Sequence, residues 1–182
     1  MVTRVRPATV EDARGVATVH VETWRAAYRG LIDDAVLDAQ RVEQREQMWT
    51  RWLERTGAGQ PSYGDGDAVH RMLVAEADGA ITGWATFGRG RDAEDAGRGE
   101  LAGLYVLPGH WGTGTGHALI EHAVLGLRSD GWREAYLWVL HGNERAIRFY
   151  GRHDWHADGT ERLGAAGGAT ELRELRLVRR LA

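Results

Sequence analysis

The segment 110–117, HWGTGTGH, constrains the fold most strongly because it places glycine at positions 112, 114 and 116. It follows an apolar run over 99–107 that Pro108 ends, and it precedes the helical pattern ALIEHAVLGL. The first turn of a helix carries unpaired N–H groups and the positive end of the helix dipole, and glycine lets a ligand approach them. The segment therefore predicts an anion site at a helix N-terminus, although glycines that only permit a tight strand-to-helix turn would look the same.

Two common phosphate-binding motifs do not fit this run. The dinucleotide fingerprint G-x-G-x-x-G fails in both frames, because its last glycine would fall on His117 or Leu119. A P-loop needs a lysine, and all 23 basic side chains of the chain are arginines. The glycine run therefore argues against an ATP or NAD site.

Hydrophobic periodicity along the rest of the chain predicts a mixed α/β domain over residues 1–182. Strands are expected over 2–7, on both sides of an Asp78–Gly79 hairpin turn, and over 99–107, 134–140, 155–164 and 169–180. Helices are expected over 10–28 after a Thr9–Asp12 capping box, from Asp33 or Asp34 to Gly57, and over 115–128 and 143–153. Polar loops are expected over 57–68 and 89–99.

Charge and composition narrow the class of protein. The formal net charge of −3 does not indicate a nucleic-acid-binding face and makes cationic partners more plausible. With no cysteine and no lysine, the chain cannot form a disulfide, a Cys-ligated zinc site, a thioester or a lysine Schiff base. The N-terminal segment MVTRVRPATVEDARG is charged throughout, which predicts neither a signal peptide nor a membrane span and hence a cytoplasmic protein.

Two segments together resemble the signatures of the GCN5-related N-acetyltransferases. LYVLPGHWGTGTGHALIEHAV is similar to motif A of that family, a strand ending in Val-x-Pro, then Arg/Gln-x-x-Gly-x-Gly/Ala and a helix. LWVLHGNERAIRFYGRHDW resembles its second signature, a strand followed by Asn, Ala and Phe-Tyr. Trp111 stands where the family most often has Arg or Gln, and Asp154 stands where Gly usually precedes the aromatic residue. The resemblance implies an α/β (α+β) fold with one twisted, mostly antiparallel sheet of about seven strands, four flanking helices and a V-shaped splay between the fourth and fifth strands.

The resemblance also implies acetyl-CoA as the co-substrate. Its diphosphate would bind the amides of the glycine run, and its pantetheine arm would lie beside the strand that ends at Val106. The cofactor contacts expected on this basis are Leu104, Tyr105, Val106, Trp111, Gly112, Thr113, Gly114, Thr115, Gly116, His117 and Asn143. Asn143 could equally be a helix N-cap only.

Two catalytic residues are expected. The resemblance points to Tyr150 as the general acid for the departing thiolate, whereas by pattern alone a tyrosine beside Phe149 on an apolar helix face is a core residue. Glu100 is the candidate general base, because it opens the strand that ends at Val106 and family members often have a carboxylate there. The alternative is a glutamate in solvent at a strand end.

The acceptor pocket is expected between the first two helices. Trp24, Tyr28, Asp33 and Asp34 are the candidates there, and their aromatic faces and carboxylates would favour a cationic amine. Core packing for the aromatic residues and helix capping for the aspartates are the alternatives. The histidines show no H-x-x-x-H or H-E-x-x-H spacing, so no metal site is predicted, and His110, His117 and His122 are expected at the surface or beside the cofactor.

The sequence therefore predicts an acetyl-CoA-dependent N-acetyltransferase that acetylates a primary amine of a small molecule by direct transfer in a ternary complex. An amino acid, a polyamine and an amine-bearing antibiotic are the acceptors considered. The alternatives are a protein lysine or N-terminal acetyltransferase with an open cleft, and a non-catalytic acyl-CoA-binding regulatory domain. The protein is expected to be a monomer or homodimer, with no nucleic-acid or membrane partner.

Overall fold

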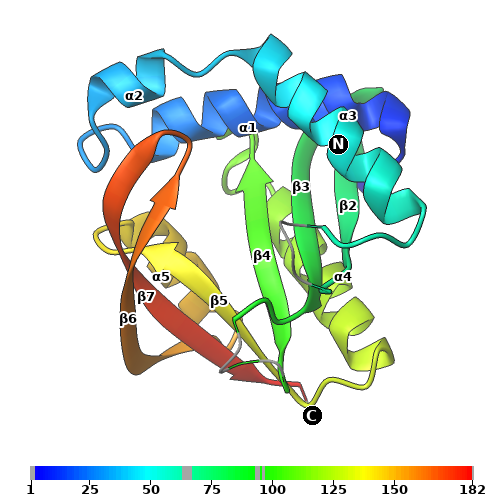
Figure 1. The fold of residues 1–182 in the computed structure, drawn as a ribbon, viewed down its shortest axis with the longest axis vertical. Helices are drawn as coiled ribbons and strands as arrows, with labels where there is room; N and C mark the ends of the chain where they lie inside the picture. Colours follow the sequence, from blue (N-terminus) through cyan, green and yellow to red (C-terminus); the bar gives the residue numbers. More distant parts are fainter. Residues whose placement is uncertain (1–2, 63–66, 93–94, 96, 182) are drawn as a thin grey trace.

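Seven strands of the computed structural model form one mixed sheet in the order β1-β2-β3-β4-β5-β7-β6 (Figure 1). The structure describes residues 3–62, 67–92, 95 and 97–181. Only β4 and β5 pair in parallel, as expected for two strands joined by a helical crossover. The strands are β1 (Arg4–Pro7), β2 (His70–Ala77), β3 (Ala80–Arg89), β4 (Gly99–Val106), β5 (Glu134–Leu140), β6 (His156–Ala166) and β7 (Ala169–Arg180).

In the described part of the chain, five α-helices flank the sheet, one more than the resemblance implied. In Figure 1, α1, α2 and α3 run across the top of the view, whereas α4 and α5 lie behind the sheet. The predicted capping box precedes α1, with the Thr9 amide donating to Asp12 Oδ2 at 2.8 Å. The helices are α1 (Ala13–Ala27), α2 (Asp34–Asp38), α3 (Val42–Gly57), α4 (Thr115–Ser129) and α5 (Glu144–Gly151).

The extra helix arises because the single helix expected over 33–57 is broken. Arg41 is extended, with φ −127° and ψ 132°, and it separates α2 from α3. At the break, the Gln40 carbonyl accepts from Arg25 at 2.7 Å, and the Gln40 side chain donates to the Gly167 carbonyl at 2.7 Å. These contacts reach residues far along the chain, so the local helical pattern could not predict them.

The predicted Asp78–Gly79 hairpin turn is confirmed, and a second hairpin turn joins β6 and β7. Asp78 and Gly79 have φ of 51° and 78° between β2 and β3, and Gly167 and Gly168 have φ of 62° and 94° between β6 and β7. Two consecutive residues with positive φ give the turn whose twist matches that of the flanking strands. The registers of these two strand pairs are therefore set locally.

Neighbouring side chains of β3 enter two different cores, since they point to opposite faces of the sheet. Trp84 packs in the core that contains Val16 of α1 and Trp49 of α3. Ala85 packs in the core that contains Leu119 of α4. The centre of the sheet is therefore covered on both faces, which gives the adjoining strand β4 a firm support.

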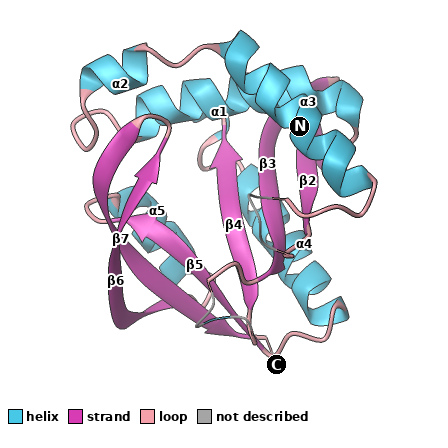
Figure 2. Cartoon of the chain, viewed as in Figure 1, coloured by secondary structure: helices cyan, strands magenta, loops and turns pink. Residues whose placement is uncertain are grey.

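The strands β4 and β5 pair only where they begin. The pairs are Gly99 with Ala135 and Glu100 with Tyr136, and the two strands then diverge (Figure 2). This confirms the V-shaped splay between the fourth and fifth strands. The backbone of 101–106 therefore has no ladder partner on its β5 side among the described residues.

A β-bulge lies in β4 where the splay begins. Thr86 of β3 pairs with Gly103, but Phe87 pairs with Leu101, so Ala102 is an extra residue in β4. Bulges bend a strand and redirect its side chains, and they are frequent beside active sites.

The two predicted polar loops can be checked only in part, because residues 63–66, 93–94 and 96 lie outside the described part of the chain. Among the residues that are described, no helix is both long and apolar enough to cross a bilayer.

Candidate active site

The glycine run borders a cavity of about 660 Å³ at the N-terminus of α4, which we call the loop cavity. Its lining includes Gly112, Gly114, Gly116 and His117, all predicted cofactor contacts. Gly112 and Gly114 have φ of +75° and +96°, a region that side chains with a Cβ rarely adopt. These two glycines are therefore required by the backbone conformation of the loop.

The loop cavity suits an anion. Gly114 is the N-cap of α4, and the Ala118 amide donates to its carbonyl at 2.9 Å, so the amides of 115–117 precede the first regular helical bond. Such amides and the helix dipole favour a phosphate group. The charged side chains that line the cavity are mostly basic: Arg145, Arg152 and Arg179, against Glu121 and Asp154.

The two threonines of the run stabilise the loop through their side chains. Thr113 Oγ1 donates to the His110 carbonyl at 2.8 Å and lies 3.2 Å from Thr115 Oγ1. Thr115 is fully buried. Neither threonine lines the loop cavity, so the cofactor contacts expected for Thr113 and Thr115 stay predictions.

Trp111 ties the glycine run to the end of β4. Its indole Nε1 donates to the Val106 carbonyl at 2.6 Å, and Thr23 Oγ1 donates to the same carbonyl at 3.0 Å. The guanidinium of Arg145 lies 3.5 Å from the centre of the Trp111 ring. Because both lone pairs of the Val106 carbonyl are used, this carbonyl cannot supply the main-chain contact predicted for Val106.

A second cavity, of about 360 Å³, lies beside β4 where the sheet opens, and we call it the splay cavity. It is lined by residues of the helices α1, α3 and α5 and of the strands β3, β4, β5, β6 and β7. The predicted site residues in its lining are Trp24, Tyr28, Glu100, Leu104, Tyr105, Asn143 and Tyr150.

Asp33 and Asp34 do not line the splay cavity, so their expected place in the acceptor pocket is not supported by the geometry. Both are exposed at the start of α2. Asp33 Oδ1 accepts from the Ala35 amide at 2.8 Å as the N-cap, and Asp34 pairs with Arg29 at 3.1 Å. The two aspartates therefore act at a helix terminus, the alternative that sequence reasoning left open.

Helix α5 brings Asn143 and Tyr150 to the site. Asn143 is its N-cap, with Oδ1 accepting from the Ala146 amide at 3.2 Å, and it lines the splay cavity rather than the loop cavity. Tyr150 is only 8% exposed and lines both cavities. Burial raises the pKa of Tyr150 well above its ordinary value, so its phenol is protonated at neutral pH.

Glu100 is buried rather than solvated, with 1% of its surface exposed. Arg91 donates to both carboxylate oxygens, at 2.6 and 2.9 Å, and His70 Nε2 lies 3.5 Å away. Burial by itself would raise the pKa of Glu100, but His70 and Arg91 stabilise its charged form and lower the pKa to about 2. The role of Glu100 as general base stays a prediction, and its pairing with Arg91 works against it because such a carboxylate binds a proton weakly.

His20 and Arg45 are among the residues of the splay cavity that sequence reasoning missed. Trp49 Nε1 donates to His20 Nδ1 at 3.2 Å, and burial lowers the pKa of His20 to about 3, so the neutral ring carries its proton on Nε2. Arg45 is half-buried and donates to Gln40 Oε1 at 2.6 and 3.2 Å. The only sequence signal was the position of His20 four residues before Trp24 on α1.

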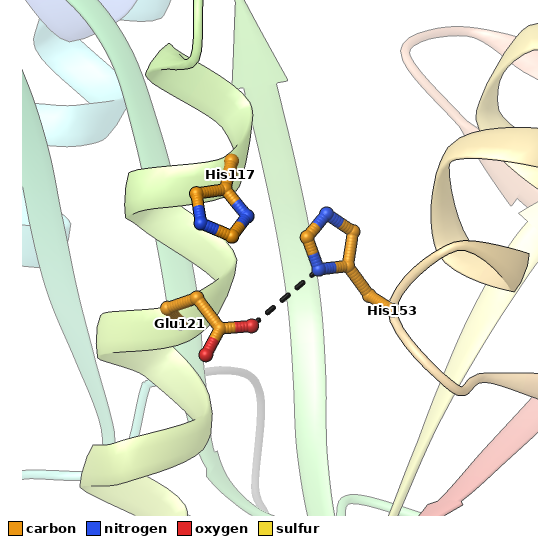
Figure 3. A group of neighbouring side chains, drawn as sticks. All are labelled: His117, Glu121 and His153. Atoms are coloured by element: carbon orange, nitrogen blue, oxygen red, sulfur yellow. Dashed lines mark ion pairs between the residues drawn. The ribbon is translucent and has the colours of Figure 1, made fainter.

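Three side chains that could hold a metal ion also meet beside the loop cavity (Figure 3). His117 and Glu121 lie one turn apart on α4, and His153 follows α5. Their candidate ligand atoms all lie within 4.8 Å of one another. The helical spacings tested in the sequence could not find this group, because its third member comes from a distant segment.

The glycine loop lies at a helix N-terminus that suits an anion, and Tyr150 lines both the loop cavity and the splay cavity beside it. The sequence profile of the acetyltransferase (GNAT) family matches residues 24–155. The chain belongs to this family and is an acetyltransferase.

Individual relatives agree with this assignment. An uncharacterized N-acetyltransferase of Bacillus subtilis, YuaI, is 30% identical over 147 residues, which cover 80% of this chain and 76% of the relative. The PaiA N-acetyltransferase of Thermoplasma acidophilum, solved in complex with coenzyme A, has a TM-score of 0.77 at 19% identity and 99% coverage of both chains. YncA of Salmonella typhimurium, a putative acetyltransferase solved with acetyl-CoA, has a TM-score of 0.67 at 20% identity, with 99% and 94% covered.

Proposed function

We propose that this protein transfers an acetyl group from acetyl-CoA to the primary amine of a small molecule in a direct ternary complex. The observation that carries the proposal is that Tyr150 lines both the loop cavity and the splay cavity. Thr23, Leu104 and Ala146 also border both, so the two cavities adjoin. A coenzyme in the loop cavity and an acceptor in the splay cavity would therefore both reach Tyr150.

The loop cavity fits the phosphorylated end of coenzyme A. The amides of 112–117 and the basic residues Arg145, Arg152 and Arg179 would hold the phosphates. The unpaired edge of β4 over 101–105 would hold the pantetheine arm by main-chain hydrogen bonds, as a peptide adds to a sheet edge. Trp111 holds the glycine loop against the end of β4, and so it fixes the position of the phosphate site relative to the pantetheine site.

When bound, the cofactor supplies an acetyl thioester. In the transfer a carbon–nitrogen bond to the amine would form and the carbon–sulfur bond would break, while the amine would lose a proton and the sulfur would gain one. Tyr150 would donate that proton from its phenol and regain one from solvent, and its raised pKa keeps the phenol protonated. We assign the removal of the amine proton to water in the splay cavity, because the Glu100 carboxylate is held by Arg91.

The size of the splay cavity supports a small acceptor. Its volume of about 360 Å³ lies at the lower end of the range for small-molecule sites. The aromatic residues Trp24, Tyr28, Trp84 and Tyr105 form much of its wall. A cavity of this volume suits an amino-acid-sized ligand better than an extended peptide.

Release of the free thiol of CoA from acetyl-CoA, followed with a thiol reagent over a panel of amines and short peptides, tests the proposal. The protein has no cysteine, so the reagent reacts with none of its side chains. We expect turnover with small amines and little with peptides, and a loss of turnover in Tyr150→Phe. If acetyl-CoA raises the melting temperature but no amine is acetylated, the protein is an acyl-CoA-binding domain and the proposal is wrong.

A further inference from the structure

We propose that the splay cavity contains a carboxylate-binding subsite anchored by Arg45, so that the acceptors are amines that also carry an acid group, such as amino acids. This inference rests on the proposed function and names the substrate class of the same site. It reverses the charge expected from Asp33 and Asp34, which lie outside the cavity.

The charged side chains of the splay cavity leave an excess of positive charge. Both of its carboxylates are already paired, Glu100 with Arg91 at 2.6 Å and Glu174 with Arg162 at 2.7 Å. Two further arginines, Arg45 and Arg145, line the cavity without a carboxylate partner among the described residues. A cationic polyamine would meet uncompensated like charge in such a cavity, whereas a carboxylate would neutralise it.

Arg45 is the better anchor of the two. Arg145 is exposed and borders the loop cavity as well, where it can serve a phosphate. Of the two cavities, Arg45 borders the splay cavity alone, and the described partners of its guanidinium are neutral. They are the amide oxygen of Gln40 at 2.6 and 3.2 Å, the sulfur of Met48 at 3.6 Å and the ring of Trp24 at 5.8 Å. Arg45 is half-buried, and this burial lowers the pKa of its guanidinium because less water surrounds the charge. A partly desolvated guanidinium is a strong binding partner for a carboxylate.

The polar atoms around Arg45 are also mostly donors. His20 Nε2, Trp24 Nε1 and Trp84 Nε1 are buried and have no hydrogen-bond partner among the described residues, and all three side chains line the splay cavity. An indole N–H can only donate, and His20 carries its proton on Nε2. Unpaired buried donors are costly unless an acceptor reaches them, and a carboxylate provides several lone pairs.

The test compares three matched acceptors: an amino acid, its carboxamide and its decarboxylated amine. In the wild-type protein we expect the amino acid to be acetylated with a kcat/KM about 10- to 100-fold higher than the other two, since a hydrogen bond to a charged group has an effect of that size. Arg45→Met should remove this preference, mainly by raising KM for the amino acid, and Arg45→Lys should restore part of it. Arg51→Met, at an exposed position of the same helix, is the matched control.

The outcomes separate this inference from the proposed function. No turnover with any amine defeats the proposed function itself. Two results overturn the subsite but leave the proposed function intact. One is turnover that favours the carboxamide or the decarboxylated amine. The other is a preference for the amino acid that persists in Arg45→Met while the melting temperature is unchanged. The subsite requires that Arg45→Lys restores part of the preference for the amino acid. If both variants lower the melting temperature and Arg45→Lys restores none of this preference, Arg45 has a structural role and the subsite is overturned.

A second, independent observation concerns the group His117, Glu121 and His153 (Figure 3). We propose that these side chains bind a divalent transition metal, for which Zn²⁺ is the probe. Two imidazoles and one carboxylate are a ligand set typical of zinc. His153 Nδ1 and Glu121 Oε1 are 3.4 Å apart, about the separation of two ligands bound to one tetrahedral zinc ion at 2.0–2.1 Å. His117 is exposed, so its ring can turn to complete the set.

Calorimetric titration of the cysteine-free protein with Zn²⁺ tests this site without any measurement of activity. We expect one ion per chain, and at least about 10-fold weaker binding in His117→Ala, Glu121→Gln and His153→Ala. His122→Ala, at an exposed position of the same helix, should bind as the wild type does. The appearance of tetrahedral Co²⁺ absorption bands would support the geometry. Absence of binding, or binding unchanged in the double variant His117→Ala/His153→Ala, overturns the site.

Discussion

Replacement of Glu100 by glutamine should destabilise the protein in a pH-dependent way. Glu100 is 1% exposed, and Arg91 donates to its two oxygens at 2.6 and 2.9 Å. The substitution keeps the size of the side chain but removes its charge, so Arg91 loses its ionic partner. Removal of one member of a buried ion pair is costly because the other charge is left uncompensated.

The pKa of Glu100 gives the magnitude. It is lowered from 4.5 to about 2, and this corresponds to a contribution to the free energy of unfolding of about 3 kcal/mol at neutral pH. Because the pKa is lowered in the folded state, the contribution is complete above pH 4.5 and disappears as the pH falls to about 2. For a chain of this size, the loss corresponds to a fall in melting temperature of about 6–12 °C.

Urea unfolding of the wild type and Glu100→Gln at pH 7 and at pH 3 is the assay. The difference in the free energy of unfolding should be about 3 kcal/mol at pH 7 and clearly smaller at pH 3. Glu54→Gln, an exposed substitution on α3, should change neither value. Equal stability of Glu100→Gln and the wild type at pH 7 would refute the reasoning, because Glu100 would then not be a stabilising buried charge.

The same variant tests the predicted base. If Glu100 accepts the proton of the amine, Glu100→Gln should lose activity at neutral pH and recover as the amine deprotonates at higher pH. If Glu100 only pairs with Arg91, the pH profile of kcat/KM should keep its shape at a temperature where the variant is folded.

Three further substitutions test the site and the core. Tyr150→Phe should lower kcat about 10- to 100-fold with little change in melting temperature, and an unchanged kcat when chemistry limits turnover would exclude the proton donor. Gly114→Ala should lower the free energy of unfolding by about 1–2 kcal/mol, because φ is +96° at this position, and it should weaken the rise in melting temperature that CoA causes. Gly151→Ala is the control, since Gly151 has an ordinary φ and open space around it. Gly126→Ala should lower the free energy of unfolding by about 1–3 kcal/mol, because the new Cβ would lie 2.7 Å from Phe87 Cζ. Urea unfolding measures the change. A more stable variant would contradict the prediction and would show that the better helix propensity of alanine outweighs the close contact.

Local signals in the sequence determined much of the fold. The glycines at 112 and 114, the Asp78–Gly79 turn and the caps at Thr9 and Asn143 appear in the structure where the sequence predicted them. Each depends on the backbone conformation of only a few consecutive residues, which residue type and spacing encode directly. The resemblance to a family extended these signals to one mostly antiparallel sheet and to the splay between its fourth and fifth strands.

Tertiary structure alone decided the electrostatics of the site. The sequence contains Arg45, Arg91 and Glu100 but does not show that Arg91 neutralises Glu100 while Arg45 faces the splay cavity. It likewise does not show that His153 reaches Glu121, or that Gln40 leaves the helix for a contact with β-hairpin residue 167. A charge or hydrogen bond acts over a few ångströms in space, and the partners here are up to 127 positions apart in the chain, so only the packing of the helices on the sheet determines which groups meet.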